Sequence, residues 1–306
     1  MKKIRDNHLM RRILVNWQLY LFVLPAVLYF LLFHILPLFG LQIAFRDYRP
    51  ARGFFDSTWV GLKHFTRFFN SYYFVTVMRN TLTITILTLI MGFPLPILLA
   101  LLLNELPGKR FSKVIQTVSF APHFISVVVL CGIIILFLNP STGMLNHLLR
   151  LLGMEPVNFL GRPELYKWVH VISGVWQETG WASVIYFAAL AGVDLSLHEA
   201  ARIDGANKFQ RMVHINFPVL VPIIVVLLIM RCGSLLSVGY EKVYLLQNDM
   251  NVSASEVIST YVYKAGLINN DYSFSTAVGL FNSVINCIML VLVNGISRKF
   301  NESSLW

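Results

Sequence analysis

Long apolar runs without a charged residue constrain this chain more than any other feature of its sequence. Residues 17–39 and 81–103 contain no Lys, Arg, Asp or Glu, and 56% of the chain is hydrophobic while only 13% is charged. A helix of about 20 apolar residues crosses the roughly 30 Å of hydrocarbon in a membrane. Soluble domains carry about twice this share of charged residues. The composition therefore predicts an all-α membrane protein.

The apolar runs predict six transmembrane helices in a single domain that covers residues 1–306. Their expected ranges are about 17–39, 81–103, 114–138, 168–193, 218–238 and 276–297. The first run is too long for a signal-peptide core and lacks a small-residue cleavage site, so we expect it to be retained as a span. Pro25 and Pro37 are expected to kink or end this first helix. The group Gly92, Pro94 and Pro96 is expected to break the second.

Lysine and arginine are distributed as the positive-inside rule requires for cytoplasmic N- and C-termini. The segments placed inside, which include 1–16 and 194–217, carry these residues at about twice the density of the outer segments. The net charge of +10 does not indicate nucleic-acid binding, because the basic residues are scattered between apolar blocks. Segment 194–217 is therefore expected to lie in the cytoplasm.

The outer segment 40–79 is rich in aromatic and basic residues. An interfacial belt, in which rings lie at the lipid headgroups and long cations extend toward water, explains this composition. A contact for a binding protein or an acidic ligand is the alternative. The residues concerned include Arg46, Arg49, Arg52, Trp59, Lys63 and Arg67.

A polar interruption at 196–222 carries two helix-start signals with one glycine between them. Ser196 followed by Glu199 has the spacing of a capping box, and Asn207 followed by Gln210 repeats it. Gly205 lies between them, where a left-handed residue ends a helix. The local chemistry therefore predicts two short helices joined at Gly205.

The second of these short helices is expected to have an apolar side. Phe209, Met212, Val213 and Phe217 lie within about a turn of each other on what should be a water-facing loop. An exposed apolar side predicts a partner surface.

The same residues resemble a known family. The pattern E-A-A-x-x-D-G-A at 199–206, with Ile215, Pro218 and Pro222, resembles the cytoplasmic "EAA" loop of permease subunits of bacterial ABC importers. The stretch 176–222 resembles the carbohydrate branch, and the chain is most similar to permeases for oligosaccharides and polysaccharides such as alginate or pectin fragments. WVGLKHFTRFF at 59–69 and VGLFNSVIN at 278–286 extend the resemblance over nearly the whole chain. His214 departs from it, since many relatives have a basic residue there.

The resemblance implies a type I ABC importer permease fold in the bacterial cytoplasmic (inner) membrane. It also implies a second homologous permease, two ATP-binding cassette subunits and an extracytoplasmic solute-binding protein as partners. The chain has no G-x-x-x-x-G-K-[ST] motif, so we expect ATP and Mg to bind in the partner ATPases and no cofactor to bind here. The residues expected to couple to the ATPase are Glu199, Ala200, Ala201, Asp204, Gly205, Ala206 and Phe209.

Two charged residues lie inside predicted spans. Glu178 is near the middle of the fourth and Arg231 well inside the fifth. Each costs about 2.5 to 3.5 kcal/mol at a helix centre unless it is paired or faces water. They either pair, with each other or with another subunit, or line a translocation cavity.

The resemblance places substrate-facing residues of the fourth span at positions three, four and seven apart, which share one helical face. Asn282 and Asn286 on the sixth span have amides that suit sugar hydroxyls, although hydrogen bonds between helices explain them equally well. On the fifth span, Arg231, Leu235 and Gly239 are expected to share a face. The expected cavity residues are Gly174, Gln177, Glu178, Trp181, Arg231, Leu235, Gly239, Asn282 and Asn286.

A saccharide suits such a cavity because its apolar ring face stacks on an indole such as Trp181. Arg231 and the basic outer segment favour a uronic acid, whereas Glu178 favours a neutral sugar. One alternative is an importer permease of the same fold for another solute, such as amino acids. The other is an integral-membrane enzyme, but the spans offer no second carboxylate beside Glu178, so no catalytic residue is expected.

No metal site is expected either, because the histidines are dispersed and the three cysteines lie singly in apolar runs. Cys131, Cys232 and Cys287 are interpreted as packing residues.

Overall fold

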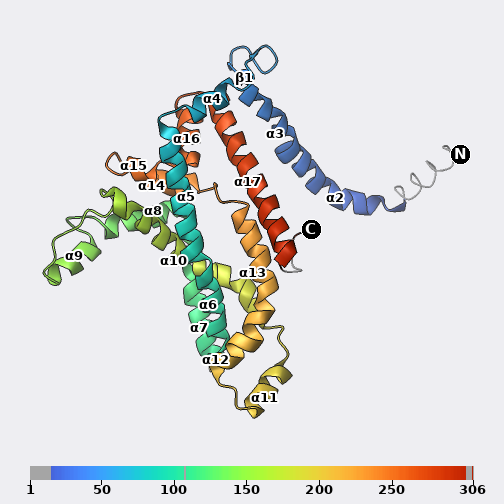
Figure 1. The fold of residues 1–306 in the computed structure, drawn as a ribbon, viewed down its shortest axis with the longest axis vertical. Helices are drawn as coiled ribbons and strands as arrows, with labels where there is room; N and C mark the ends of the chain where they lie inside the picture. Colours follow the sequence, from blue (N-terminus) through green and yellow to red (C-terminus); the bar gives the residue numbers. More distant parts are fainter. Residues whose placement is uncertain (1–14, 107, 301–304, 306) are drawn as a thin grey trace.

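The computed structural model describes residues 15–106, 108–300 and 305, and this part of the chain is mostly helical (Figure 1). Four of its helices are long and apolar enough to cross a membrane, or up to six spans exist if each of two bent helix pairs is one span. The expectation of a multispan helical protein is thus confirmed in this coarse form. The N-terminal basic cluster and most of the C-terminal tail lie outside the described residues.

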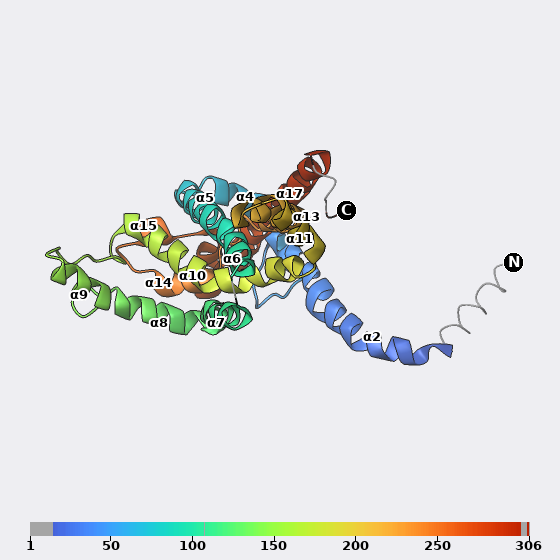
Figure 2. The same ribbon diagram turned by 90° about the horizontal axis from the view of Figure 1, so that it is seen from below.

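The first candidate span is an arm that projects from the body (Figures 1 and 2). It runs Trp17–Phe45 and contains α2 (Trp17–Phe30), the π-helical turn η1 (Leu31–Ile35), α3 (Leu36–Leu38) and the 3-10 helix η2 (Phe39–Phe45). Pro25 lies inside α2 without ending it, and no residue of α2 is buried. The helix continues six residues beyond the predicted end at 39.

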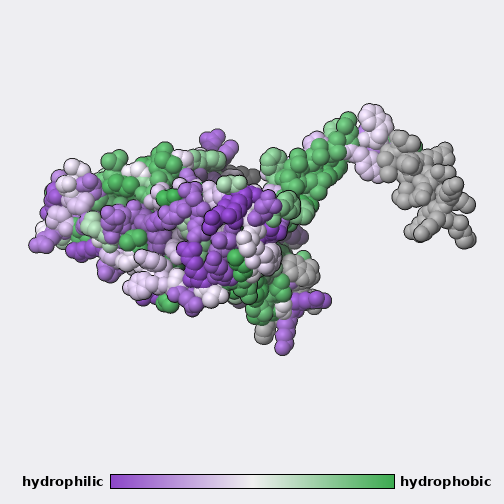
Figure 3. All heavy atoms as spheres, turned by 90° about the horizontal axis from the view of Figure 1, so that it is seen from above, coloured by the Kyte–Doolittle hydropathy of each residue, from purple (hydrophilic) through white to green (hydrophobic). Residues whose placement is uncertain are grey.

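A short antiparallel hairpin follows the arm and was not predicted. Strand β1 (Arg46–Asp47) pairs with β2 (Thr58–Trp59) before α4 (Lys63–Phe69). Arg46 donates through Nη1 to the carbonyls of Phe54, Phe55 and Ser57 at 3.0 to 3.3 Å. This arginine therefore holds its own hairpin loop. Viewed from this end, the body is largely hydrophilic and the arm largely hydrophobic (Figure 3).

The second candidate span is longer and straighter than predicted. Helices α5 (Tyr73–Gly92) and α6 (Pro94–Asn104) together form one 32-residue span, which starts eight residues before the predicted 81. At Phe93 the backbone stays in the α region and its N–H still donates to the Leu89 carbonyl at 3.1 Å. The predicted break is therefore present only as a one-residue interruption at Phe93, and α5 and α6 remain one span because Pro94 begins α6 where its missing N–H is tolerated.

The predicted third span, 114–138, is not one straight helix. Helix α7 (Lys109–Phe120), the 3-10 turn η3 (Ala121–Phe124) and α8 (Val127–Phe137) bend by 97°. The turn contains Pro122, Ile125 is extended, and Ser126 caps α8 by accepting from the Val129 N–H at 3.3 Å. A proline and a fresh N-cap thus start a new helix inside an apolar run.

The chain then returns through α9 (Met144–Leu151) to the 28-residue helix α10 (Pro163–Leu190). The 194–217 loop holds α11 (Leu195–Ile203), α12 (Lys208–Arg211) and the π-helical turn η4 (Met212–Asn216). Helix α13 (Phe217–Cys232) ends six residues before the predicted 238. The 194–217 loop lies at the opposite end of the molecule from the β1–β2 hairpin (Figure 1).

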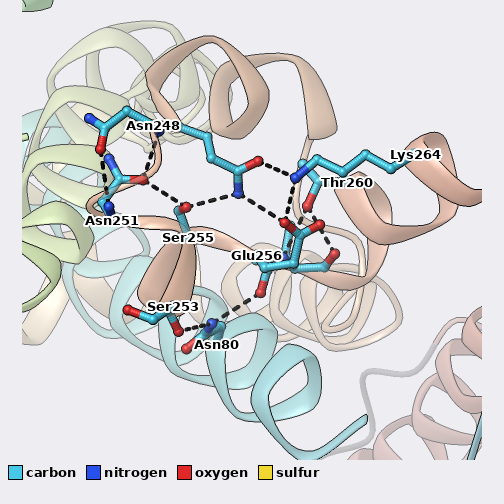
Figure 4. A network of polar contacts seen from close by, with 10 residues as sticks. Asn80, Asn248, Asn251, Ser253, Ser255, Glu256, Thr260 and Lys264 are labelled. Atoms are coloured by element: carbon cyan, nitrogen blue, oxygen red, sulfur yellow. Dashed lines mark hydrogen bonds and ion pairs between the residues drawn. The ribbon is translucent and has the colours of Figure 1, made fainter. Parts of the chain in front are cut away.

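The expected outer loop 239–275 is a folded helical lobe. It comprises α14 (Tyr240–Leu246), α15 (Val252–Ser255), α16 (Ile258–Tyr263) and the π-helical turn η5 (Lys264–Ile268), and it leads into α17 (Tyr272–Phe300). A polar network holds the lobe together (Figure 4). Lys264 Nζ contacts both Glu256 Oε2 and Gln247 Oε1 at 2.5 Å, and buried Asn80 of α5 donates to the Glu256 carbonyl at 3.1 Å.

Candidate functional site

A cavity of about 420 Å³ lies between α5, α6, α10, α13 and the segment that follows α13. This volume falls within the range of about 300 to 1,000 Å³ that is common for small-molecule sites. Apolar side chains form most of the wall, and the charged side chains Glu178 and Arg231 reach it from α10 and α13. Six expected cavity residues line it: Gly174, Glu178, Trp181, Arg231, Leu235 and Gly239.

Gln177 is not part of the cavity lining. Its side chain is buried and donates through Nε2 to the Ile125 carbonyl at 2.8 Å. Ile125 is the extended residue between η3 and α8, where helical hydrogen bonding is interrupted. Gln177 therefore satisfies a backbone acceptor at this bend.

Asn286 and Asn282 also lie outside the lining. Asn286 Oδ1 accepts from the Leu236 N–H at 3.0 Å, and its Nδ2 donates to Ser237 Oγ at 2.8 Å. Asn282 Oδ1 is buried without a hydrogen-bond partner among the described residues. For Asn286 the structure thus shows the alternative role, a hydrogen bond from α17 to the chain after α13.

Leu235 and Gly239 line the cavity for a different reason from the one expected. Because α13 ends at Cys232, these residues do not share a helical face with Arg231. The chain instead folds along the cavity as a series of turns, held by Asn286. A side chain at Gly233, the C-cap, would collide with Leu290 of α17, so the two helices approach closely where α13 ends.

Glu178 pairs with His123 rather than with Arg231. Glu178 Oε2 lies 3.2 Å from His123 Nδ1, and the imidazole stacks on the Trp181 indole at a centroid distance of 4.7 Å and an interplanar angle of 2°. The turn η3 supplies His123, and it comes close because Gly180 leaves no side chain between α10 and the Ser119 carbonyl of α7. His123 therefore covers one face of Trp181, and Phe124 makes an edge contact with the same indole at a centroid distance of 6.0 Å.

Arg231 makes no side-chain hydrogen bond or ion pair with the described residues. The expectation that Glu178 and Arg231 pair with each other is wrong, because Glu178 has its own partner. A charged guanidinium at the cavity wall is left to a ligand, to water or to another subunit.

Lys242 is a second cation, close behind the cavity wall, that the sequence does not predict at the site. From α14 its Nζ donates to the His170 carbonyl at 3.0 Å and lies 3.2 Å from where a Cβ on Gly174 would be. The absent side chain of Gly174 thus leaves the ammonium close behind the cavity wall. Burial lowers the pKa of Lys242 to about 8. The sequence does not predict Lys242 at the site because 239–275 is expected to be an outer loop. It does not predict His123 there because this residue lies within a predicted span.

The 194–217 loop has the two short helices that the sequence predicts. Gly205 has a φ of +78°, and the Ala206 N–H donates to the Ala201 carbonyl at 2.8 Å, which closes the end of α11. Asn207 and Gln210 form a reciprocal capping box at α12, with bonds of 2.9 and 2.8 Å.

The start of α11 differs from the prediction. Asp194 is the N-cap and its Oδ1 accepts from the Ser196 N–H at 2.9 Å, so the Ser196–Glu199 capping box is wrong. This hydrogen bond lowers the pKa of the Asp194 carboxyl. The carboxylate of Asp194 takes the N-cap role in place of the Ser196 hydroxyl because an anion is favoured at a helix N-terminus. Glu199 is exposed and free to meet a partner.

The loop presents apolar side chains and a recess to its surroundings. Phe209 is 68% exposed, Val213 and Phe217 are also exposed, and Met212 packs inward. Ile203, which is not among the apolar residues predicted for this surface, is 87% exposed. A recess of about 300 Å³ beside these side chains is lined by the expected coupling residues Ala201, Asp204, Gly205 and Ala206.

Comparison with known proteins defines the class of this molecule. The family described as binding-protein-dependent transport system inner membrane component matches residues 92–302. The chain belongs to this family. It is a membrane-embedded transport subunit and not an enzyme.

Individual relatives are similar over nearly their full length. The polygalacturonan/rhamnogalacturonan transport system permease protein YteP of Bacillus subtilis (strain 168) is 42% identical, over 100% of this chain and 95% of that protein. Protein LplB of the same strain is 43% identical, over 94% of this chain and 91% of that protein. A chain from a crystal structure of a bacterial alginate ABC transporter, in complex with an alginate pentasaccharide-bound periplasmic protein, superposes with a TM-score of 0.89. It is 38% identical and covers 96% of this chain and 99% of that one.

Proposed function

We propose that this chain is the membrane-spanning subunit of an ATP-driven importer for an acidic oligo- or polysaccharide in a bacterial cytoplasmic membrane. The observation that carries the proposal is the composition of the cavity. Trp181 lines the cavity and is 48% exposed, Arg231 has no side-chain hydrogen bond or ion pair with the described residues, and Lys242 lies behind Gly174. An apolar ring face and carboxylates match these groups.

Glu178 does not oppose an anionic ligand as strongly as its charge suggests. Its carboxylate is already paired with His123, so two cations near the wall face one partnered anion. The relatives named for polygalacturonan and alginate, both acidic, support the same conclusion.

Alternating access would move the saccharide. Paired ATPases bind the two short helices of the 194–217 loop, and ATP binding draws this loop toward that of a second, homologous permease. A loaded extracytoplasmic binding protein delivers the saccharide at the opposite end. Six spans with both termini in the cytoplasm complete the proposed topology.

ATP hydrolysis by the whole complex tests this function. The complex is co-purified with its neighbouring gene products in nanodiscs and challenged with binding protein loaded with acidic or neutral oligosaccharides. Stimulation by the acidic class is expected. Stimulation only by neutral sugars would contradict the charge assignment, and stimulation by no saccharide would favour another solute.

A further inference from the structure

Three polar residues meet where the end of α6 faces the start of α13. Arg211 Nη2 lies 3.5 Å from Glu105 Oε2, and Asn216 Nδ2 donates to Glu105 Oε1 at 3.3 Å. Arg211 is 7% exposed, and Asn216 is fully buried. These are not solvated surface contacts, whose contribution would be small.

The position of Glu105 is electrostatically unfavourable without this arrangement. It is the C-cap of α6, where the helix dipole already presents negative charge. A buried arginine is also costly unless it is partnered. Each charge therefore offsets the cost of the other, and removing either leaves an uncompensated charge in a largely buried site.

Arg211 contacts the turn between α11 and α12 as well as the end of α6. Its Nη1 donates to the Ala206 carbonyl at 2.9 Å, and Ala206 follows Gly205 in the turn between α11 and α12. One guanidinium thus joins the turn of the 194–217 loop to the end of α6. A lysine has a single ammonium and lacks the fork that reaches both acceptors.

Helix α6 connects this junction to the cavity. It continues α5 across Phe93 as one span, and Gly92, Phe93 and Pro96 on this span line the cavity. Ala100 and Leu101 of α6 pack with Tyr186 of α10 in one buried cluster. A displacement of the end of α6 is therefore carried along a rigid, packed helix to the cavity wall.

We propose that Glu105 and Arg211 form a latch that makes α5–α6 move with the 194–217 loop. The inference rests on the proposed function, and it adds a second mechanical connection beside the direct one through α13. Glu105 and Arg211 are positioning residues, since neither contacts the cavity.

Transport per ATP hydrolysed tests the latch. Glu105→Gln and Arg211→Met are reconstituted in the complete importer with its ATPases and loaded binding protein. Both variants are expected to keep the subunit stoichiometry of the assembled complex, to lose some thermal stability because one charge is left unpaired, and to lose roughly fivefold or more in saccharide imported per ATP, within the usual range of coupling between sites. Arg211→Lys should give an intermediate loss. Glu155→Gln is the matched control and should behave as wild type, because this exposed acid lies between α9 and α10 and makes no hydrogen bond or ion pair with the described residues.

The double variant Glu105→Gln/Arg211→Met separates a latch from two independent effects. A latch predicts that it is no worse than either single variant, because the first substitution already breaks the connection. Additive losses, or unchanged transport per ATP in the folded single variants, would overturn the proposal. Wild-type stimulation by loaded binding protein, measured alongside, tests the proposed function separately.

Discussion

The 194–217 loop and the cavity have opposite polarity relative to their surroundings. The loop exposes apolar side chains such as Ile203 and Phe209, whereas the cavity has the charged side chains of Glu178 and Arg231 in a largely apolar wall. Each arrangement is costly in isolation and is offset by a partner of the matching kind. The difference supports the proposal that the loop binds a partner protein and the cavity a polar solute.

Disrupting the turn in the loop should give the largest effect. Gly205→Val places a β-branched residue at a φ of +78°, which costs about 1 to 2 kcal/mol and displaces the α11–α12 pair. The protein is expected to remain in the membrane while binding-protein-stimulated ATP hydrolysis falls by about tenfold or more. Gly205→Asn is the matched control, since asparagine tolerates this conformation and should retain most activity. Normal transport by the valine variant would contradict the role of the turn.

Removing the charge of Arg231 should change the selectivity of the cavity between acidic and neutral saccharides. Arg231→Ala is expected to reduce stimulation by acidic saccharides by about tenfold, the value of one lost charge-assisted hydrogen bond, with little change for neutral ones. Dose–response curves of ATP hydrolysis with both ligand classes measure this difference. Equal losses for both classes would support an assembly role for Arg231.

The charge on Lys242 should give a smaller, pH-dependent effect. With a pKa of about 8, this ammonium is largely charged at pH 7 and loses its charge as the pH rises through 8. Stimulation by an acidic saccharide is therefore expected to fall by a few-fold between about pH 7 and 9. Lys242→Arg should keep the response and remove its pH dependence, and Lys242→Met should be low throughout. A pH profile in Lys242→Arg identical to wild type would assign the effect to another group.

Replacing the cap of α11 should have the smallest effect and distinguishes two local structures. Asp194→Ala is expected to increase hydrogen exchange of the first amides of α11, because the acceptor of the Ser196 N–H is lost. Ser196→Ala should leave these amides unchanged. Because its hydrogen bond lowers the pKa of Asp194, the contribution of this cap is present above the usual carboxyl pKa and is lost as pH falls below it. Faster exchange in Ser196→Ala, with no change in Asp194→Ala, would instead support the predicted Ser196–Glu199 capping box.

The features that the sequence predicts well are those decided within a few residues. The Asn207–Gln210 box and the left-handed Gly205 follow from neighbouring chemistry, and the face of Gly174, Glu178 and Trp181 follows from helical periodicity. The cap of α11 was misassigned because two acceptors two residues apart compete for one role.

The features that the sequence could not provide depend on contacts between distant segments. The early end of α13 involves Asn286, about 50 residues further along the chain, which bonds the backbone of Leu236. His123 reaches Glu178 because Gly180 lets the end of α7 approach α10 closely, although the two residues are 55 positions apart. Lys242 reaches Gly174 only because the apparent loop 239–275 folds into helices against α10.

The π-helical turn η4 makes the number of residues in this part of the loop as important as their identity. Arg211 and Asn216 are five positions apart, and in an α-helix they would lie about 140° apart around the axis. A π turn pairs residues i and i+5, so both side chains reach Glu105 across η4. If the same residues wound as an ordinary α-helix, one of the two side chains would turn away from Glu105, whereas deleting one residue between them would place the two four positions apart, about 40° around an α-helix. Among homologous chains, those with one residue fewer in 212–216 should therefore have an ordinary α-helix here and keep both contacts.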